Sequence, residues 1–193
     1  MKQKCCKVKI TVLFAHYVRH TSRCITVRFL NFRNRDRGPA MAEITAPLLA
    51  KYIISVRHAC GDKITQLKLQ KLIYYVQAWH LGLYGREIFR EEIEAWVHGP
   101  VVPSVRAMYR DHRWSPLPAP ESIPELPLTI QAHVKKVLAV YGGLSASDLE
   151  AISHTEDPWI TARSNKSPKE PSSAVISKAH MKNYFSRAAS GSF

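Results

Sequence analysis

Five side chains that could bind a metal ion or transfer protons are spread along the sequence: His80, His98, His154, Glu156 and Asp157. Imidazoles and carboxylates are common zinc ligands and general acids and bases. However, the sequence contains no Gly-rich phosphate loop, no Gly-x-Ser-x-Gly motif and no His-Glu-x-x-His motif. His80 falls on an apolar helical stripe and His154 precedes a helix start, where structural roles are commoner. We therefore expect no enzymatic activity and no metal or other cofactor.

The net charge of +13 is concentrated at the start of the sequence. Residues 1–40 carry ten basic residues, one acidic residue and three of the four cysteines, whereas residues 41–193 carry a net charge of only +4. The apolar run Val8–Val18 is interrupted by polar residues and is too short to span a bilayer. Residues 1–40 could be a targeting peptide, a basic arm for nucleic acid or acidic membrane, or sequence upstream of a translation start at Met41. We favour the third interpretation and place the domain at residues 41–193.

The elements of this domain are predicted to be mainly helical. Thr45 can cap a first helix that ends at Gly61, and Thr65 can cap a second helix that continues to about Tyr84. The second helix is apolar or aromatic over most of its circumference, which predicts a central position with contacts on several sides. The residues that this pattern leaves for solvent are Lys68, Lys71, Ala78 and Gly82.

The rest of the domain predicts shorter elements. Residues 93–97 alternate between apolar and polar side chains, which favours a short strand, and Gly99-Pro100 is expected to turn the chain. Five prolines exclude regular structure from residues 111–127, and a loop of that length is either functional or mobile. Further helices are expected at residues 103–110, 128–141 and 145–152, from Pro158, and in a last segment that reaches Phe185. The predicted fold is a compact, mainly α single domain with a minor short β element.

Two classes of macromolecule are candidate partners. The first two helices and the turn between them have helix-turn-helix spacing, and Lys63, Lys68 and Lys71 gather near the second helix start. The other face of that helix carries Tyr, Gln and Leu rather than Arg, Lys and Asn, so a DNA-binding repressor is the less favoured hypothesis.

Aromatic residues favour a protein partner instead. All four tryptophans and seven of the eight tyrosines lie after Met41. Tyr74, flanked by Gln70 and Gln77, and Trp96, on the outer face of the strand, are hard to bury by pattern alone. Because Tyr and Trp concentrate at protein interfaces, we expect a partner surface near the second helix.

Three ordered strings resemble the Panacea domain, the family of SocA-type antitoxins and phage-associated GepA-like proteins. Residues 67–81 read LKLQKLIYYVQAWHL and resemble the signature helix of the family. Residues 94–103 and 144–159 match further motifs, and the segment from Ile176 to Phe185 also fits. The family pattern has no counterpart of residues 1–40, and an aromatic residue is expected where the sequence has Arg106.

The resemblance implies a cytoplasmic, helical antitoxin that counteracts a protein toxin encoded nearby, usually by direct binding. In the SocA-type branch, the antitoxin instead delivers its toxin to a ClpXP-type protease. No catalytic residues come with the family, and no membrane association is expected. Gln70, Tyr74 and Gln77 are the residues that we expect to contact the toxin most directly. The full set of toxin-binding candidates is Lys68, Gln70, Lys71, Tyr74, Tyr75, Gln77, Trp96, His154 and Trp159.

Overall fold

The computed structural model describes residues 43–164, 166–167 and 169–191. The basic extension predicted at residues 1–40 and the possible start at Met41 lie outside these ranges. Within them, the chain is mainly helical with a small two-stranded antiparallel sheet, as predicted. The elements are α2 (Ala46–Ala59), α3 (Gln66–Tyr84), β1 (Glu94–Trp96), β2 (Gly99–Val101), α4 (Pro103–Met108), the 3-10 helix η1 (Arg110–His112), α5 (Leu128–Tyr141), α6 (Ala146–Ser153), α7 (Asp157–Arg163) and α8 (Lys178–Ser190).

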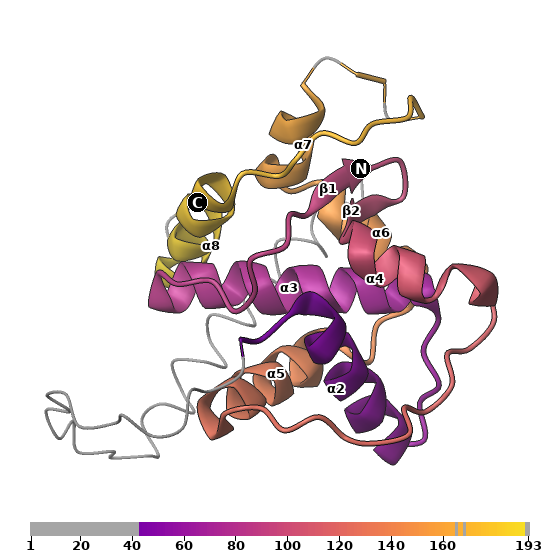
Figure 1. The fold of residues 1–193 in the computed structure, drawn as a ribbon. Coiled ribbons are helices and arrows are strands. Elements are labelled where there is room, and N and C mark those ends of the chain that lie inside the picture. Colours follow the sequence, from indigo (N-terminus) through magenta and orange to yellow (C-terminus); the bar gives the residue numbers. More distant parts are fainter. Residues whose placement is uncertain (1–42, 165, 168, 192–193) are drawn as a thin grey trace, which may run out of the picture.

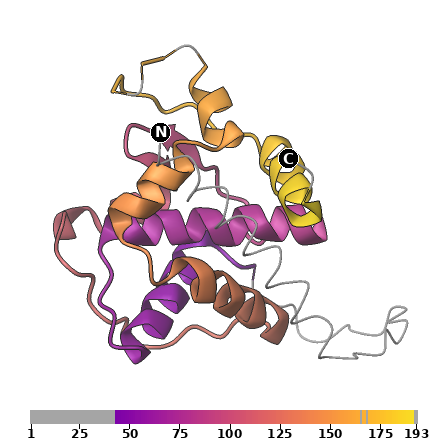
Figure 2. The same cartoon turned by 180° about the vertical axis from the view of Figure 1, so that it is seen from behind.

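Helix α3 runs through the middle of the molecule (Figures 1 and 2). Helices α2 and α5 lie on one side of it, and the hairpin, α6, α7 and α8 lie on the other. Thirteen of its 19 residues are buried, which confirms the predicted central position. The predicted solvent-facing wedge is wrong for Lys71 and Ala78, which are fully buried, and holds only in part for the half-buried Lys68 and Gly82.

Local capping residues define the helix ends where the sequence predicts them. The Thr45 and Thr65 hydroxyls each accept a hydrogen bond from a backbone N–H of the first turn. Ser145 and Asp148 form a reciprocal capping box at the start of α6. Gly85 ends α3 with a φ of 70°, a conformation that suits glycine best.

The β-hairpin packs beside the N-terminal half of α3. Glu94 pairs with Val101 and Trp96 pairs with Gly99, so Gly99-Pro100 belongs to the second strand, and the predicted turn lies instead at residues 97–98. The free edge of β1 is covered by a later segment, because the Ala95 N–H donates to the Ala174 carbonyl at 2.8 Å. The hairpin is therefore held between α3 and the segment that leads into α8.

Two further features determine the shape of the domain. The predicted loop 111–127 is wrong at its start, because η1 continues to His112, but residues 113–127 contain no helix or strand. The buried side chains of Leu117 and Leu126 anchor this segment to the core. Helix α8 approaches α3 closely at Gly82, where an added Cβ would lie 2.6 Å from the Cβ of Phe185.

Within the described ranges, none of the helices combines the length and apolarity that a bilayer crossing requires.

Candidate partner-binding site

The predicted site residues on α3 are buried beneath neighbouring segments. Gln70, Lys71, Tyr74, Tyr75 and Gln77 expose at most 2% of their surface. The expectation that Gln70, Tyr74 and Gln77 lie at the surface is therefore wrong. The physical reason is that residues 88–102, α6 and α8 cover this face of the helix. In this conformation, the five side chains offer almost no surface to a partner.

The two buried glutamines bind the backbone of irregular segments. The Gln77 side chain accepts a hydrogen bond from the Ile88 N–H and donates one to the Phe89 carbonyl, each at 2.8 Å. Gln70 accepts from the Val102 N–H at 2.8 Å. A side-chain amide offers the same donor and acceptor pair as a backbone peptide group, so these residues satisfy segments that have no strand partner. Their polarity serves the fold.

Tyr74 and Glu156 form a polar contact in the core. The Tyr74 hydroxyl donates to Glu156 Oε2 at 2.9 Å, and both side chains are almost completely buried. Burial raises the pKa of Glu156 to about 8, although the hydrogen bond from Tyr74 opposes that shift. Beside them, Tyr75 stacks on Tyr141 with ring centroids 4.1 Å apart. The carboxyl group is thus predominantly protonated at neutral pH.

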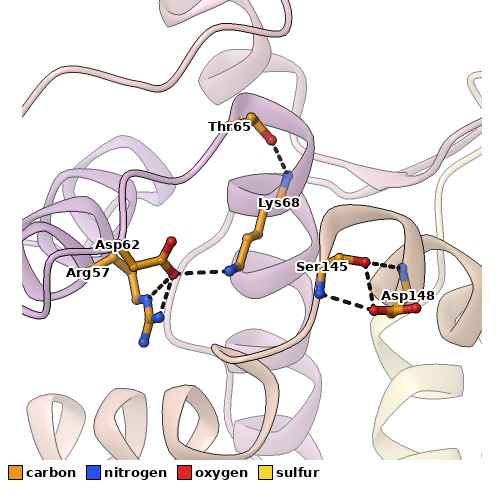
Figure 3. A network of polar contacts seen from close by, with 6 residues as sticks. All are labelled: Arg57, Asp62, Thr65, Lys68, Ser145 and Asp148. Atoms are coloured by element: carbon orange, nitrogen blue, oxygen red, sulfur yellow. Dashed lines mark hydrogen bonds and ion pairs between the residues drawn. The ribbon is translucent and has the colours of Figure 1, made fainter.

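The two lysines of the signature helix have different surroundings. Lys71 donates to the Pro100 carbonyl at 3.2 Å, and burial lowers its pKa to about 7 while the charge of Glu150 opposes the shift. Gly99 leaves the space for this lysine, since an added Cβ would lie 2.7 Å from Lys71 Cε. Lys68 instead pairs with Asp62 at 3.0 Å, and Asp62 also binds Arg57 (Figure 3).

His154 and Trp159 connect α6 and α7 to the hairpin. The His154 and Trp159 rings stack with centroids 4.0 Å apart, and the Trp159 indole N–H donates to the Trp96 carbonyl at 3.1 Å. Burial is the largest cause that lowers the pKa of His154. The guanidinium group of Arg163 lies over the Trp159 ring, with Cζ 4.9 Å from the ring centroid. Trp159 is buried and His154 is half-buried, so their observed contacts are structural.

The side chains that could bind a metal or transfer protons are not brought together. His80 hydrogen-bonds the Arg86 carbonyl at 2.6 Å, whereas His98 pairs with Glu150 at 3.1 Å. Glu156 belongs to the buried contact with Tyr74, and Asp157 lies 3.7 Å from Arg187. Among the residues that the structure describes, no three His, Cys, Asp or Glu side chains are grouped as a metal site would require.

Two predicted site residues, Trp96 and Gln70, border concave surface, although Gln70 exposes only 2% of its surface. Trp96 lines a hollow of about 360 Å³ together with Gln66, Leu67, Gln70, Val101, Arg106, Arg113 and Trp114. With His98, it also lines an adjoining hollow of about 600 Å³ that Lys166 and Pro171 complete. We call these two hollows together the Trp96 groove. Lys71, Glu156 and His133, whose pKa values burial shifts to about 7, 8 and 4, do not line either hollow.

Sequence reasoning missed Trp114, Arg113 and the role of Arg106 in this surface. Trp114 exposes 70% of its surface and lies at the start of the proline-rich segment. The available signals were the length of that segment and an arginine at position 106 in place of the aromatic residue expected from the family pattern. Neither signal is part of a helical or strand pattern, so neither indicated which side chains face the surface.

The comparisons with known proteins identify the family. A family model described as "Antitoxin SocA-like, Panacea domain" matches residues 69–160. The antitoxin SocA of Caulobacter vibrioides (strain NA1000 / CB15N) is 30% identical over 133 residues, which cover 60% of this chain and 69% of the relative. The chain belongs to the SocA-like, Panacea-domain antitoxin family. No solved structure matches it significantly.

The matched range extends from within α3 to within α7 and contains residues of both regions described above. It includes the buried residues Gln70, Tyr74 and Glu156, and it also includes Trp96 and Trp114. Membership of this family implies a toxin as the general class of partner. The resemblance to the Panacea domain is confirmed.

Proposed function

We propose that the protein is a non-enzymatic, cytoplasmic antitoxin that neutralises a cognate protein toxin by direct binding. Family membership supports the antitoxin role. The observation that carries direct binding is the contrast within the predicted site. Tyr74 and Gln77 on α3 form hydrogen bonds within the protein, whereas Trp96 borders a groove lined by aromatic and cationic side chains. Such a surface suits recognition of a macromolecule.

A recognition helix for DNA is disfavoured by the packing of α3. Its lysine at position 71 is buried, and Lys68 is paired with Asp62. Helices and the hairpin lie on both sides of α3 (Figures 1 and 2), and most of its described side chains are buried, so the described part of the chain leaves little of this helix for a DNA groove. Direct protein binding is therefore the function that the geometry supports best.

Co-expression of the full 193-residue chain with the product of the adjacent gene tests this function. We expect growth to be rescued, the purified proteins to co-elute in size-exclusion chromatography, and rescue to persist in cells that lack ClpXP. The toxin half-life should not change when the antitoxin is present. A shortened half-life, together with rescue that disappears without ClpXP, would contradict direct neutralisation and establish a protease adaptor instead. Absence of both rescue and complex would contradict the proposed function.

A further inference from the structure

The Trp96 groove combines apolar and cationic side chains on one concave surface. Its apolar lining includes Leu67, Val101 and the two tryptophans, and its charged or titratable lining consists of Arg106, Arg113, Lys166 and His98. Among the described residues that line it, none is acidic. Three acidic groups that contact groove residues already have partners there: Glu94 accepts from the Trp96 indole N–H at 2.7 Å, Glu150 binds His98, and the Glu170 carboxylate lies 3.9 Å from Lys166 Nζ.

The two guanidinium groups of the groove are available to an external anion. In the part of the chain that the structure describes, neither Arg106 nor Arg113 lies within ion-pair distance of a carboxylate. Arginine favours carboxylates because its planar donor pair matches the two carboxylate oxygens. An unpaired pair of arginines beside apolar surface therefore complements a partner that carries acidic side chains.

The segment that holds Trp114 is fixed in an unfavourable backbone conformation. Arg113 has a φ of 45° and a ψ of −107°, although it is not glycine. The segment is anchored on both sides, because Ser115 N donates to the His112 carbonyl at 2.7 Å and Leu117 N donates to the Ile64 carbonyl at 2.9 Å. Strain of this kind clusters at functional positions. Here the anchored segment holds Trp114 in place, so little conformational entropy is lost when a partner binds to it.

We propose that an acidic segment of the toxin binds in the Trp96 groove, with an apolar side chain against Trp96 and Trp114 and carboxylates on Arg106 and Arg113. This inference rests on the proposed function and names the surface and the chemistry of the partner. A protein segment fits better than a nucleic acid, because the groove sets two arginines beside apolar side chains and lacks the long row of cations that a phosphate backbone requires.

The test measures binding of the purified adjacent-gene product to the full chain and to surface variants. Trp114→Ala removes the apolar anchor and should weaken binding about 30-fold, the size of effect expected for a central interface tryptophan. Arg106→Glu combined with Arg113→Glu should weaken binding about as much and should flatten its salt dependence. Matched controls on α5 are Leu128→Ala, at a side chain that is 81% exposed, and Lys135→Glu. Both should bind like the unmodified chain, and circular dichroism should show the same fold for all variants.

A second arm identifies the chemistry of the bound segment. Overlapping peptides that cover the toxin sequence are tested for binding. Peptides in which Asp and Glu flank an apolar residue should bind the unmodified chain and should not bind the double arginine variant. Preference for Lys- and Arg-rich peptides would overturn the proposal. So would single-stranded oligo(dT) that competes with the toxin and loses its binding through the same substitutions.

The outcomes separate this inference from the proposed function. If the toxin binds the unmodified chain and all groove variants equally, the groove assignment is wrong and direct neutralisation stands. If the toxin does not bind the unmodified chain, both fail together.

Discussion

The polar side chains of the interior around α3 are bonded within the protein, whereas the charged side chains of the Trp96 groove face outward. In the interior, the amides of Gln70 and Gln77 are bonded to backbone groups. In the groove, Arg106 and Arg113 carry charges that no described carboxylate pairs. The comparison teaches that residues of the signature helix such as Gln70 and Gln77 hold the fold together, so membership of a family motif does not by itself mark a side chain as exposed.

The largest effect should come from breaking a buried amide contact. Gln77→Leu should lower the free energy of unfolding by about 4 kcal/mol, because the Ile88 N–H and the Phe89 carbonyl would be buried without partners. Urea denaturation measures this loss. Asn183→Leu, a change at an exposed amide on α8, is the control and should alter stability by less than about 0.5 kcal/mol. Similar losses in both variants would show that the interior amide has no special role.

The next effect concerns the protonated carboxyl group of the interior. Because burial holds the pKa of Glu156 near 8, the unfolded chain releases this proton at lower pH than the folded chain does. The contribution of Glu156 to stability therefore falls as pH rises from about 4.5 to 8. Glu156→Gln removes this dependence, so the variant should gain about 3 kcal/mol relative to the unmodified chain between about pH 5 and pH 7.5. Denaturation curves of both proteins at each pH measure the difference, and a constant difference would contradict the prediction.

A smaller effect of opposite sign is expected on the acid side. The His133 Nε2–H donates to the Val76 carbonyl at 2.9 Å, because a carbonyl oxygen can only accept. Burial lowers the pKa of His133 to about 4. The unfolded chain binds a proton first as pH falls from about 6.5, so stability is lost between that pH and about 4. His133→Gln should remove roughly 2 kcal/mol of this loss between about pH 6 and pH 4.5. Equal acid sensitivity of the variant would refute the assignment to His133.

The smallest effect on stability is expected in the groove. Trp114→Ala should change the free energy of unfolding by less than about 0.5 kcal/mol, because the side chain is 70% exposed. Thermal melting measures this change. A large loss would mean that Trp114 supports the fold and that the two regions are less distinct than their contacts indicate.

The sequence predicted the helices well and the burial of polar residues poorly. Helix ends depend on local residues such as Thr45, Thr65 and Gly85, whose capping contacts lie within one turn. Gln70 and Gln77 bind segments 11 to 32 residues away that lack regular structure. Periodicity cannot distinguish a glutamine that faces water from one that faces such a backbone. Trp114 was missed for a related reason, since its segment has no periodicity at all.

The close approach of α8 to α3 at Gly82 also has a consequence for synthesis. Helix α3 packs against α8 more extensively than against any other element. The rings of Tyr75 and Trp79 meet Phe185, which follows them by about a hundred residues in the chain. On the ribosome, the apolar face of α3 therefore emerges long before its cover does. A shortened product that lacks residues 178–190 would present that face uncovered, and quality-control proteases would meet an antitoxin whose signature helix is intact but unprotected.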